Sequence, residues 1–328
     1  MTDEDAPFAP VRVVTVHRDA LEVAGPAFDG RLASPSAGDA DAATVGDWLL
    51  IDPHTRRIER FLERRTVFKR KGAGTQHRVQ LIAANVDTLL LITSANQDFN
   101  LARLERYLAL ALDAEVTPVL VITKADLVDA TPFIARARRS MPALAVKAVD
   151  AREPEEATRL APWFGRGQTV ALLGSSGVGK STLLNTLAGR ALQSTQATRS
   201  DDDRGRHTTT ARSLHRLPGG AWMLDTPGMR ELQLFDVADG IDEVFADLAS
   251  LAAACRFSDC THAAEPGCAI RTAMESGAID AERLSRYEKL RREEARNSET
   301  IAEARARAKA FGRMARQVME RKRKQREW

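Results

Sequence analysis

The sequence lacks the features of a secreted or membrane protein. Its 328 residues include three cysteines, all between Cys255 and Cys268, which are too few and too clustered for a disulfide framework. No apolar run reaches the length of about 18 residues that a membrane-spanning helix needs. The acidic N-terminus has no apolar stretch of the kind found in signal peptides. These absences predict a cytoplasmic protein in a reducing environment, with no membrane partner.

The chain also has little net charge, but its charged residues are unevenly distributed. The formal net charge is +3, yet residues 311–328 hold seven Lys or Arg and two Glu, so the rest of the chain is slightly acidic. A basic tail on a near-neutral body indicates an anionic partner such as RNA, and a solvated helix end is the alternative.

The clearest motif present is a phosphate-binding loop, G-x-x-x-x-G-K-S. An apolar run at 169–173 precedes it and a helical pattern at 182–187 follows, which is the strand, loop and helix context that the motif requires. Backbone N–H groups of such a loop cradle phosphates at the N-terminal end of the helix. We expect Lys180 to reach the β- and γ-phosphates and Ser181 to hold magnesium. The predicted phosphate-binding residues are Gly174, Ser175, Ser176, Gly177, Val178, Gly179, Lys180, Ser181 and Thr182.

Two further motifs each follow an apolar strand. Asp225-Thr226-Pro227-Gly228 comes after the strand pattern at 222–224, so Asp225 can organise magnesium and the Gly228 N–H can meet the γ-phosphate. An ordinary turn is the alternative. Thr123-Lys124-Ala125-Asp126 comes after the pattern at 119–122. The Asp126 carboxylate can accept hydrogen bonds from guanine N1–H and the exocyclic amine, a donor pair that adenine lacks, while Lys124 packs along the base. A capped helix start is the alternative.

A polar segment, 201–210, lies between the phosphate loop and Asp225. It has no stripe of apolar residues, and it suits a switch loop that γ-phosphate and magnesium order. Thr208, Thr209 or Thr210 could offer a hydroxyl to magnesium, and we assign Thr209.

The order of these motifs is unusual, because the guanine motif precedes the phosphate loop instead of following it. Such an order is a circular permutation of the usual GTPase site. With the segments 83–87 (Ala-Ala-Asn-Val-Asp), 106–108 (Arg-Tyr-Leu), 205–210 (Gly-Arg-His-Thr-Thr-Thr) and 225–230 (Asp-Thr-Pro-Gly-Met-Arg) and the cysteine cluster, the chain resembles the circularly permuted GTPases of the RsgA or YjeQ family. The resemblance extends from about Val11 to about Ala310.

The resemblance implies a five-stranded OB-fold barrel, a central α/β GTPase domain and a C-terminal helical zinc domain. It also implies a factor that binds the small ribosomal subunit and its rRNA, assists late maturation of that subunit, and hydrolyses GTP to GDP and phosphate with stimulation by the subunit. We expect this factor to be a monomer. Two alternatives remain open from the residues: an RNA-docking protein for which GTP is a structural ligand, and a phosphate-loop ATPase, against which Asp126 argues.

Three positions depart from common GTPase patterns. Thr123 stands where asparagine is commoner. The best match to the last base-contacting motif, usually Ser-Ala, is Asp150-Ala151, whose Ala151 N–H could meet the guanine oxygen. Met229 follows Gly228 where many GTPases have a glutamine that orients water, and a thioether cannot do this. His207 is therefore our candidate catalytic group, with a surface histidine as the alternative.

Three thiols and one imidazole gather near the C-terminal end. Three Cys and one His form a closed tetrahedral set suited to one structural zinc ion, and a catalytic zinc would need an open position. Buried thiols with a chance histidine are the alternative. The predicted ligands are Cys255, Cys260, His262 and Cys268.

The pattern of apolar segments predicts four regions. Residues 1–9 are expected to be disordered, and five short strand-like segments suit an OB-fold over 10–67. A basic segment, 64–72, is interpreted as the linker to the next domain, and contact with phosphate is the alternative. Alternating strands and helices predict a mostly parallel sheet over 68–240, with the nucleotide at the carboxyl ends of its strands. Residues 241–328 are expected to form the zinc-binding and basic helical region.

Overall fold

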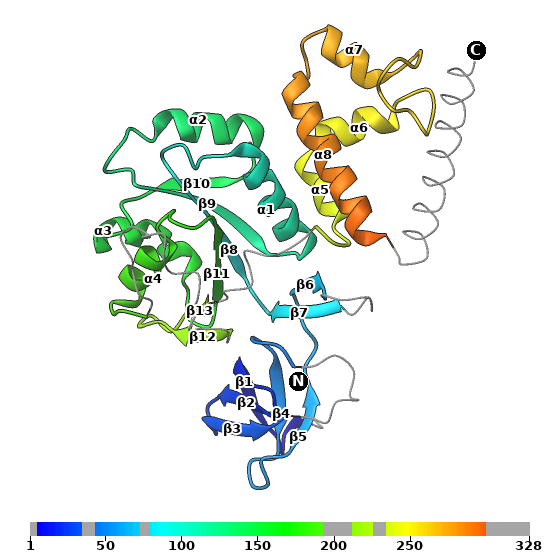
Figure 1. The fold of residues 1–328 in the computed structure, drawn as a ribbon. Helices are drawn as coiled ribbons and strands as arrows, with labels where there is room; N and C mark the ends of the chain where they lie inside the picture. The colour runs from blue at the N-terminus through cyan, green and yellow to red at the C-terminus, as the bar shows by residue number, and fades with distance from the viewer. Residues whose placement is uncertain (1–4, 35–42, 73–78, 193–211, 226–233, 300–328) are drawn as a thin grey trace, which may run out of the picture.

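The computed structural model describes residues 5–34, 43–72, 79–192, 212–225 and 234–299. Figure 1 shows three parts: a small β region at the N-terminal end, a central α/β region, and a group of helices toward the C-terminal end. This is the expected fold class, a barrel followed by an α/β region and a helical region that carries the cysteine cluster.

The N-terminal region is an antiparallel sheet in the order β3-β2-β1-β4-β5. Val11 and Val13 of β1 are fully buried because alternate residues of a strand point to one face, and they pack with Leu21 and Leu49. Five strands around one apolar core match the partly open barrel that the sequence predicts. Its strands are β1 (Ala9–Val16), β2 (Ala20–Ala24), β3 (Gly30–Ala33), β4 (Trp48–Ile51) and β5 (Ile58–Phe61).

The segment interpreted as a linker is structured. Residue 67, at which we expected the barrel region to end, is the first of strand β6 (Val67–Lys71), which pairs antiparallel with β7 (Val79–Ala84). Phe68 is buried in the core of the central region. The interpretation as a linker was wrong for residues 67–71. The basic residues around Phe68 give the segment the composition of a solvated linker, although the Phe68 side chain is part of the core.

The central sheet has the strand order β10-β9-β8-β11-β13-β12. Its first five strands are parallel, while β12 runs antiparallel to β13 and also pairs with β1 of the barrel through Thr15 and Ser213. The strands are β8 (Thr88–Ser94), β9 (Thr117–Thr123), β10 (Ala145–Ala148), β11 (Thr169–Gly174), β12 (Ser213–Arg216) and β13 (Trp222–Asp225).

Helices cover both faces of this sheet, as a parallel sheet requires. Leu89 and Leu91 of β8 pack into one core with Leu104 and Leu108 of α1, while the intervening Leu90 packs into the opposite core with α4. The helices of this region are α1 (Leu101–Asp113), α2 (Thr131–Ser140), α3 (Pro154–Ala157), the 3₁₀ helix η2 (Thr158–Trp163) and α4 (Lys180–Ala188).

A buried arginine joins the barrel to the sheet. The Arg12 side chain is 1% exposed and donates to the carbonyl oxygens of Gly46, at 3.4 Å, and Asn85, at 3.0 Å. Its guanidinium also lies 5.5 Å from the ring centre of Trp48 and 5.9 Å from that of Trp222. Desolvation lowers the pKa of Arg12 to about 10, so the cation is retained at neutral pH.

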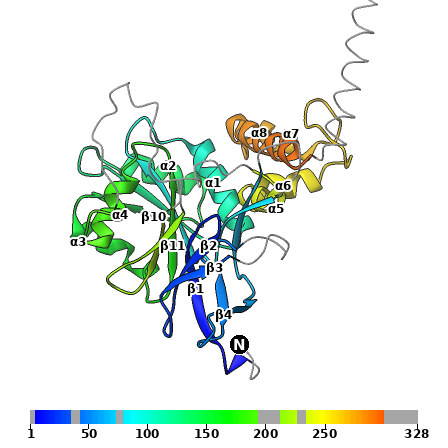
Figure 2. The ribbon, with the colours of Figure 1, turned by 60° about the horizontal axis from the view of Figure 1, so that its bottom comes forward.

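Within the described residues, four helices follow the sheet, and α5 and α8 lie beside α1 (Figure 2). Glu105 of α1 is fully buried and accepts a 2.8 Å hydrogen bond from Arg286 of α8, which offsets the cost of burying that carboxylate. Among the helices of the described ranges, none is both long enough and apolar enough to span a bilayer. The four are α5 (Ala238–Val244), α6 (Ala246–Ala253), α7 (Ala269–Glu275) and α8 (Ala281–Ser298).

Candidate nucleotide site and candidate metal centre

The phosphate loop connects β11 to α4 at the carboxyl edge of the sheet. A Cβ on Gly174 would meet the backbone oxygen of Ile92 on β8 at 2.3 Å, so no other residue fits between these adjoining strands. Gly179 has a φ of +89°, a left-handed conformation that favours glycine and that lets the chain turn into α4. The N-terminal end of α4 follows directly, as an anion-binding loop requires.

The two cationic side chains near this loop contact the loop itself. The Lys180 ammonium donates to the carbonyl oxygen of Gly174 at 2.8 Å and also to that of Ser175. Arg103 of α1 donates from Nη1 to the Ser175 hydroxyl. The loop is thus bordered by two positive charges, one from its own helix and one from α1.

Thr123 ends β9 and is completely buried. Its hydroxyl lies 2.6 Å from the carbonyl oxygen of Val178 in the phosphate loop and 3.0 Å from that of Thr93 on β8. One hydroxyl has one proton, so it donates to one of these carbonyls at a time. Thr123, which stands where asparagine is commoner, therefore connects β9 to the phosphate loop through a hydrogen bond.

The next residues, which are predicted to bind the base, form a sharp turn. Lys124 has a φ of +59°, and the Leu127 N–H donates to its carbonyl oxygen at 3.1 Å. This turn brings Asp126, whose side chain is 22% exposed, beside the loop that follows β10. In that loop Ala151 is buried, and its carbonyl oxygen accepts a 2.7 Å hydrogen bond from Thr186 of α4. Of the four predicted guanine-binding residues, Thr123 and Ala151 therefore contact the phosphate loop and its helix, while Lys124 and Asp126 lie in the turn that follows Thr123.

Arg152 connects the two loops. It donates from Nη2 to Asp126 at 2.6 Å and to Asp150 at 2.9 Å, and from Nε to Asp150 at 3.1 Å. Hydrogen bonds from the Arg152 side chain and backbone lower the pKa of Asp150, and the same two carboxylates raise the pKa of Arg152. Asp150 and Arg152 are therefore both charged at neutral pH.

The remaining predicted nucleotide residues are only partly within the described ranges. Ser181 lies half-buried in the first turn of α4, and Asp225 is the last residue of β13, two strands from β8. Thr209, Gly228 and His207 lie outside the described residues, as do Thr208, Thr210 and Met229. Their assigned roles stay predictions.

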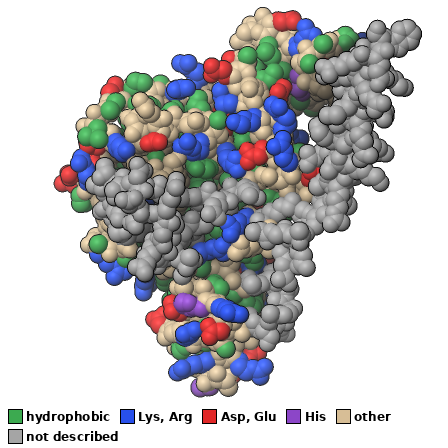
Figure 3. All heavy atoms as spheres, viewed as in Figure 1, with side chains coloured by type: hydrophobic (Ala, Val, Ile, Leu, Met, Phe, Trp, Pro, Cys, Tyr) green, Lys and Arg blue, Asp and Glu red, His purple; other side chains and the backbone are tan. Residues whose placement is uncertain are grey.

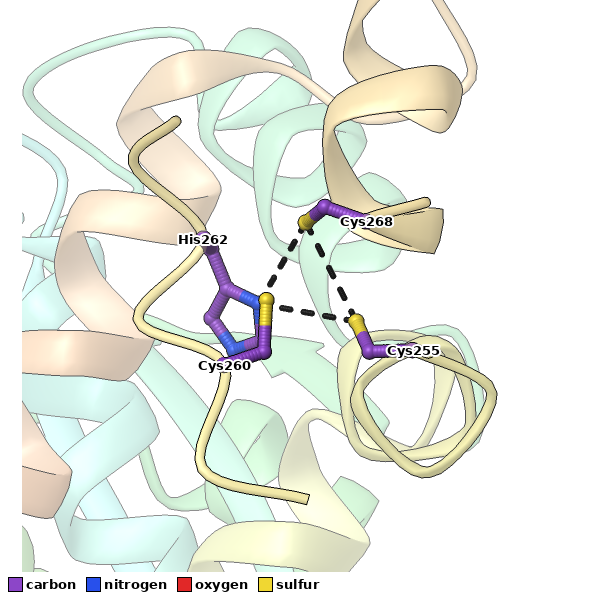
Figure 4. Close-up of side chains that lie close together, drawn as sticks. All are labelled: Cys255, Cys260, His262 and Cys268. Atoms are coloured by element: carbon purple, nitrogen blue, oxygen red, sulfur yellow. Dashed lines mark hydrogen bonds between the residues drawn. The ribbon is translucent and has the colours of Figure 1, made fainter. Parts of the chain in front are cut away.

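The cysteine cluster forms a compact candidate metal centre between α6 and α7 (Figure 4). The ligand atoms of its four residues all lie within 4.8 Å of one another. The Cys255 sulfur lies 3.9 Å from that of Cys268 and 3.7 Å from Nδ1 of His262. Tetrahedral zinc with bonds of about 2.3 Å places its sulfur ligands about 3.8 Å apart, so the set fits zinc. The four are Cys255, Cys260, His262 and Cys268.

The start of α7 supplies polar groups to this centre. Burial raises the pKa of the Cys255 thiol, but hydrogen bonds from the N–H groups of Ala269 and Ile270 outweigh it and lower the pKa overall. His262 has a φ of +61°, a strained conformation that turns its ring toward the sulfurs. A thiolate held by backbone donors is the form in which cysteine binds a metal ion.

Two residues of the nucleotide site were missed from the sequence. Arg152 directly follows the predicted base-contacting alanine, so a cation at that position was an available signal. Arg103 gives no local signal, because Ser175 lies 72 residues away in the chain.

Comparisons with known proteins agree with this geometry. The model of the RsgA GTPase family matches residues 61–235. A small ribosomal subunit biogenesis GTPase RsgA from Mesorhizobium japonicum is 52% identical over 299 residues, which cover 90% of this chain and 86% of that protein. A small ribosomal subunit biogenesis GTPase RsgA 2 from Vibrio vulnificus is 48% identical, with coverage of 95% and 89%.

Solved structures share the fold. YjeQ from Thermotoga maritima superposes with a TM-score of 0.63 at 24% identity, covering 86% of this chain and 97% of its own. YloQ, described as a circularly permuted GTPase, gives 0.60 at 20% identity, with coverage of 88% and 96%.

Proposed function

The chain belongs to the RsgA GTPase family of circularly permuted GTPases, and we propose that it assists late maturation of the small ribosomal subunit. In this proposal it binds the subunit and its rRNA, and contact with the subunit stimulates hydrolysis of GTP to GDP and phosphate. It acts in the cytoplasm, as a monomer.

One observation carries the proposal: the guanine motif and the phosphate loop meet although the chain presents them in permuted order. Parallel strands β9 and β11 flank β8, so the segments after them reach the same edge of the sheet. The Thr123 hydroxyl bonds to Val178 across that edge. The predicted phosphate loop thus lies next to the strand end that leads to Asp126, which supports GTP over ATP as substrate.

Each residue of the candidate nucleotide site has its own role in hydrolysis. Backbone N–H groups of the loop and Lys180 bind the β- and γ-phosphates, and binding frees Lys180 from the carbonyls that it now contacts. Ser181, Thr209 and Asp225 would hold magnesium, which would supply positive charge to the phosphate oxygens. The Gly228 N–H meets the γ-phosphate, and His207 accepts a proton from the attacking water.

The outer regions provide docking. Cys255, Cys260, His262 and Cys268 would hold one zinc ion, which would fix the segment between α6 and α7. Figure 3 shows Lys and Arg side chains on the barrel, the central region and the C-terminal helices, interspersed with Asp and Glu. Together with the basic composition of residues 311–328, these side chains favour contact with rRNA.

Turnover measurements test the proposal. We expect the protein to hydrolyse GTP slowly alone and faster with purified small ribosomal subunits, and to leave ATP intact in both conditions. Lys180→Ala is the matched control, because it removes the phosphate-binding charge and leaves the zinc centre in place. Recovery of bound, intact GTP after incubation with subunits would instead indicate an RNA-docking protein that uses GTP as a structural ligand.

A further inference from the structure

Asp150 and Asp126 face the same guanidinium group. Arg152 donates from a single nitrogen, Nη2, to one oxygen of each carboxylate, so those two oxygens lie no farther apart than the two bonds laid end to end. The side chains of Asp126 and Asp150 are 22% and 13% exposed, while that of Arg152 is 63% exposed. Two carboxylates are thus held together by one exposed cation.

Asp150 cannot replace that cation as a partner for Asp126. An ionised carboxylate only accepts hydrogen bonds, and a second one nearby repels the first. Asp150 is also held by its own loop, because its Oδ1 accepts the Arg152 N–H at 3.0 Å. Without the guanidinium, Asp126 would face a fixed negative charge and would turn away from it.

We propose that Arg152 is a positioning residue for guanine recognition, which bridges Asp150 to Asp126 and so orients the Asp126 carboxylate toward the N1–H and exocyclic amine of the base. A carboxylate has room for several donors, so one bond from Arg152 at Oδ2 leaves acceptor positions for both guanine groups. This inference rests on the proposed function, because it concerns the same nucleotide site.

A positioning role of Arg152 predicts a different effect on nucleotide binding than a purely structural role does. If Arg152 aims Asp126 at two donors of the base, its removal weakens the bond to the amine more than it weakens contacts with the phosphates. Inosine nucleotides test this, because hypoxanthine keeps N1–H and lacks the exocyclic amine. A purely structural role would lower affinity for GDP and IDP by the same factor.

The experiment measures equilibrium dissociation constants of GDP, IDP and ADP for the full-length protein and three variants. For Arg152→Ala we expect the preference for GDP over IDP to fall about threefold to tenfold, the range of one charge-assisted hydrogen bond at a partly exposed site. Arg152→Lys keeps one charged donor and should retain an intermediate preference. In Arg152→Ala with Asp150→Asn, the new amide can donate to Asp126, and the preference should return toward that of the parent.

Two results would overturn the inference. One is a GDP-to-IDP ratio in Arg152→Ala equal to that of the parent. The other is a double variant with the same ratio as Arg152→Ala alone, since this would mean that the charge of Asp150 does not act on Asp126. Failure of the proposed function itself would look different, because the parent protein would then show no preference for GDP over ADP.

Discussion

The nucleotide site and the cysteine cluster are built in opposite ways. The cluster takes its four ligands from one short segment, Cys255 to Cys268, and two turns and a helix start bring them together. The candidate nucleotide site takes residues from the ends of separate strands: Thr123 at the end of β9, Asp150 after β10 and the loop after β11. Only the register of the parallel sheet makes them neighbours.

The difference shows what permutation can preserve. A site assembled by a sheet depends on which strands are adjacent and not on the order in which the chain visits them, so the guanine motif can precede the phosphate loop. A site assembled by one segment depends on spacing, so a permutation within it would destroy it. Mutations in one site should therefore leave the other intact.

The largest predicted effect lies in the nucleotide site. His207→Ala should lower subunit-stimulated hydrolysis by about 10²–10⁴-fold, the usual contribution of a positioned acid–base group, with little change in GTP affinity. Single-turnover hydrolysis with and without small subunits measures it. His54→Ala, on an exposed turn of the barrel, is the control. Hydrolysis at the parent rate would make His207 a loop residue only.

Base selectivity should change next most. Asp126→Asn replaces an acceptor pair by an amide and should weaken GTP binding by about 10²-fold while improving binding of xanthine nucleotides, which present a carbonyl in place of the amine. Nucleotide competition measures the shift. Asp129→Asn, an exposed position on the same loop, should keep the parent preference. Unchanged selectivity in Asp126→Asn would refute the assignment.

A mutation in the cysteine cluster tests the independence of the two sites. The parent should bind about one zinc ion per chain, and Cys260→Ser should lose it. The variant should also have looser C-terminal helices, while its GTP affinity stays within about twofold of the parent. Metal analysis, proteolysis and nucleotide titration measure these three properties. The exposed neighbour variant Asp259→Asn should retain the metal. A large loss of GTP affinity would show that the two regions are coupled.

The smallest predicted effect tests the bond across the sheet edge. Thr123→Val keeps the shape of the side chain but removes the hydroxyl that contacts Val178, which should cost about 0.5–1.5 kcal/mol and lower GTP affinity about twofold to tenfold. Thr123→Ser keeps the hydroxyl and should bind nearly as the parent does. Equal affinities in both variants would mean that this hydroxyl does not position the loop.

Much of this architecture follows from local patterns. Short apolar runs predicted five strands in the barrel region, and they predicted β9, β11 and β13 to within a few residues, since strand formation there follows burial of alternating or continuous apolar residues. The hairpin of β6 and β7 was missed, because Lys69, Arg70 and Lys71 make the segment look solvated. The roles of individual site residues stay predictions until the variants above are measured.

The sequence by itself determined which chemical groups are present: a phosphate loop, a carboxylate suited to guanine, and a set of four metal ligands. It also indicated the family to which these motifs belong. Only the tertiary structure decided which groups act together. It placed the Thr123 hydroxyl against Val178, Arg103 against Ser175, and Arg152 between Asp126 and Asp150. The physical reason is that these contacts depend on strand adjacency and side-chain reach across the sheet edge, which no spacing along the chain encodes.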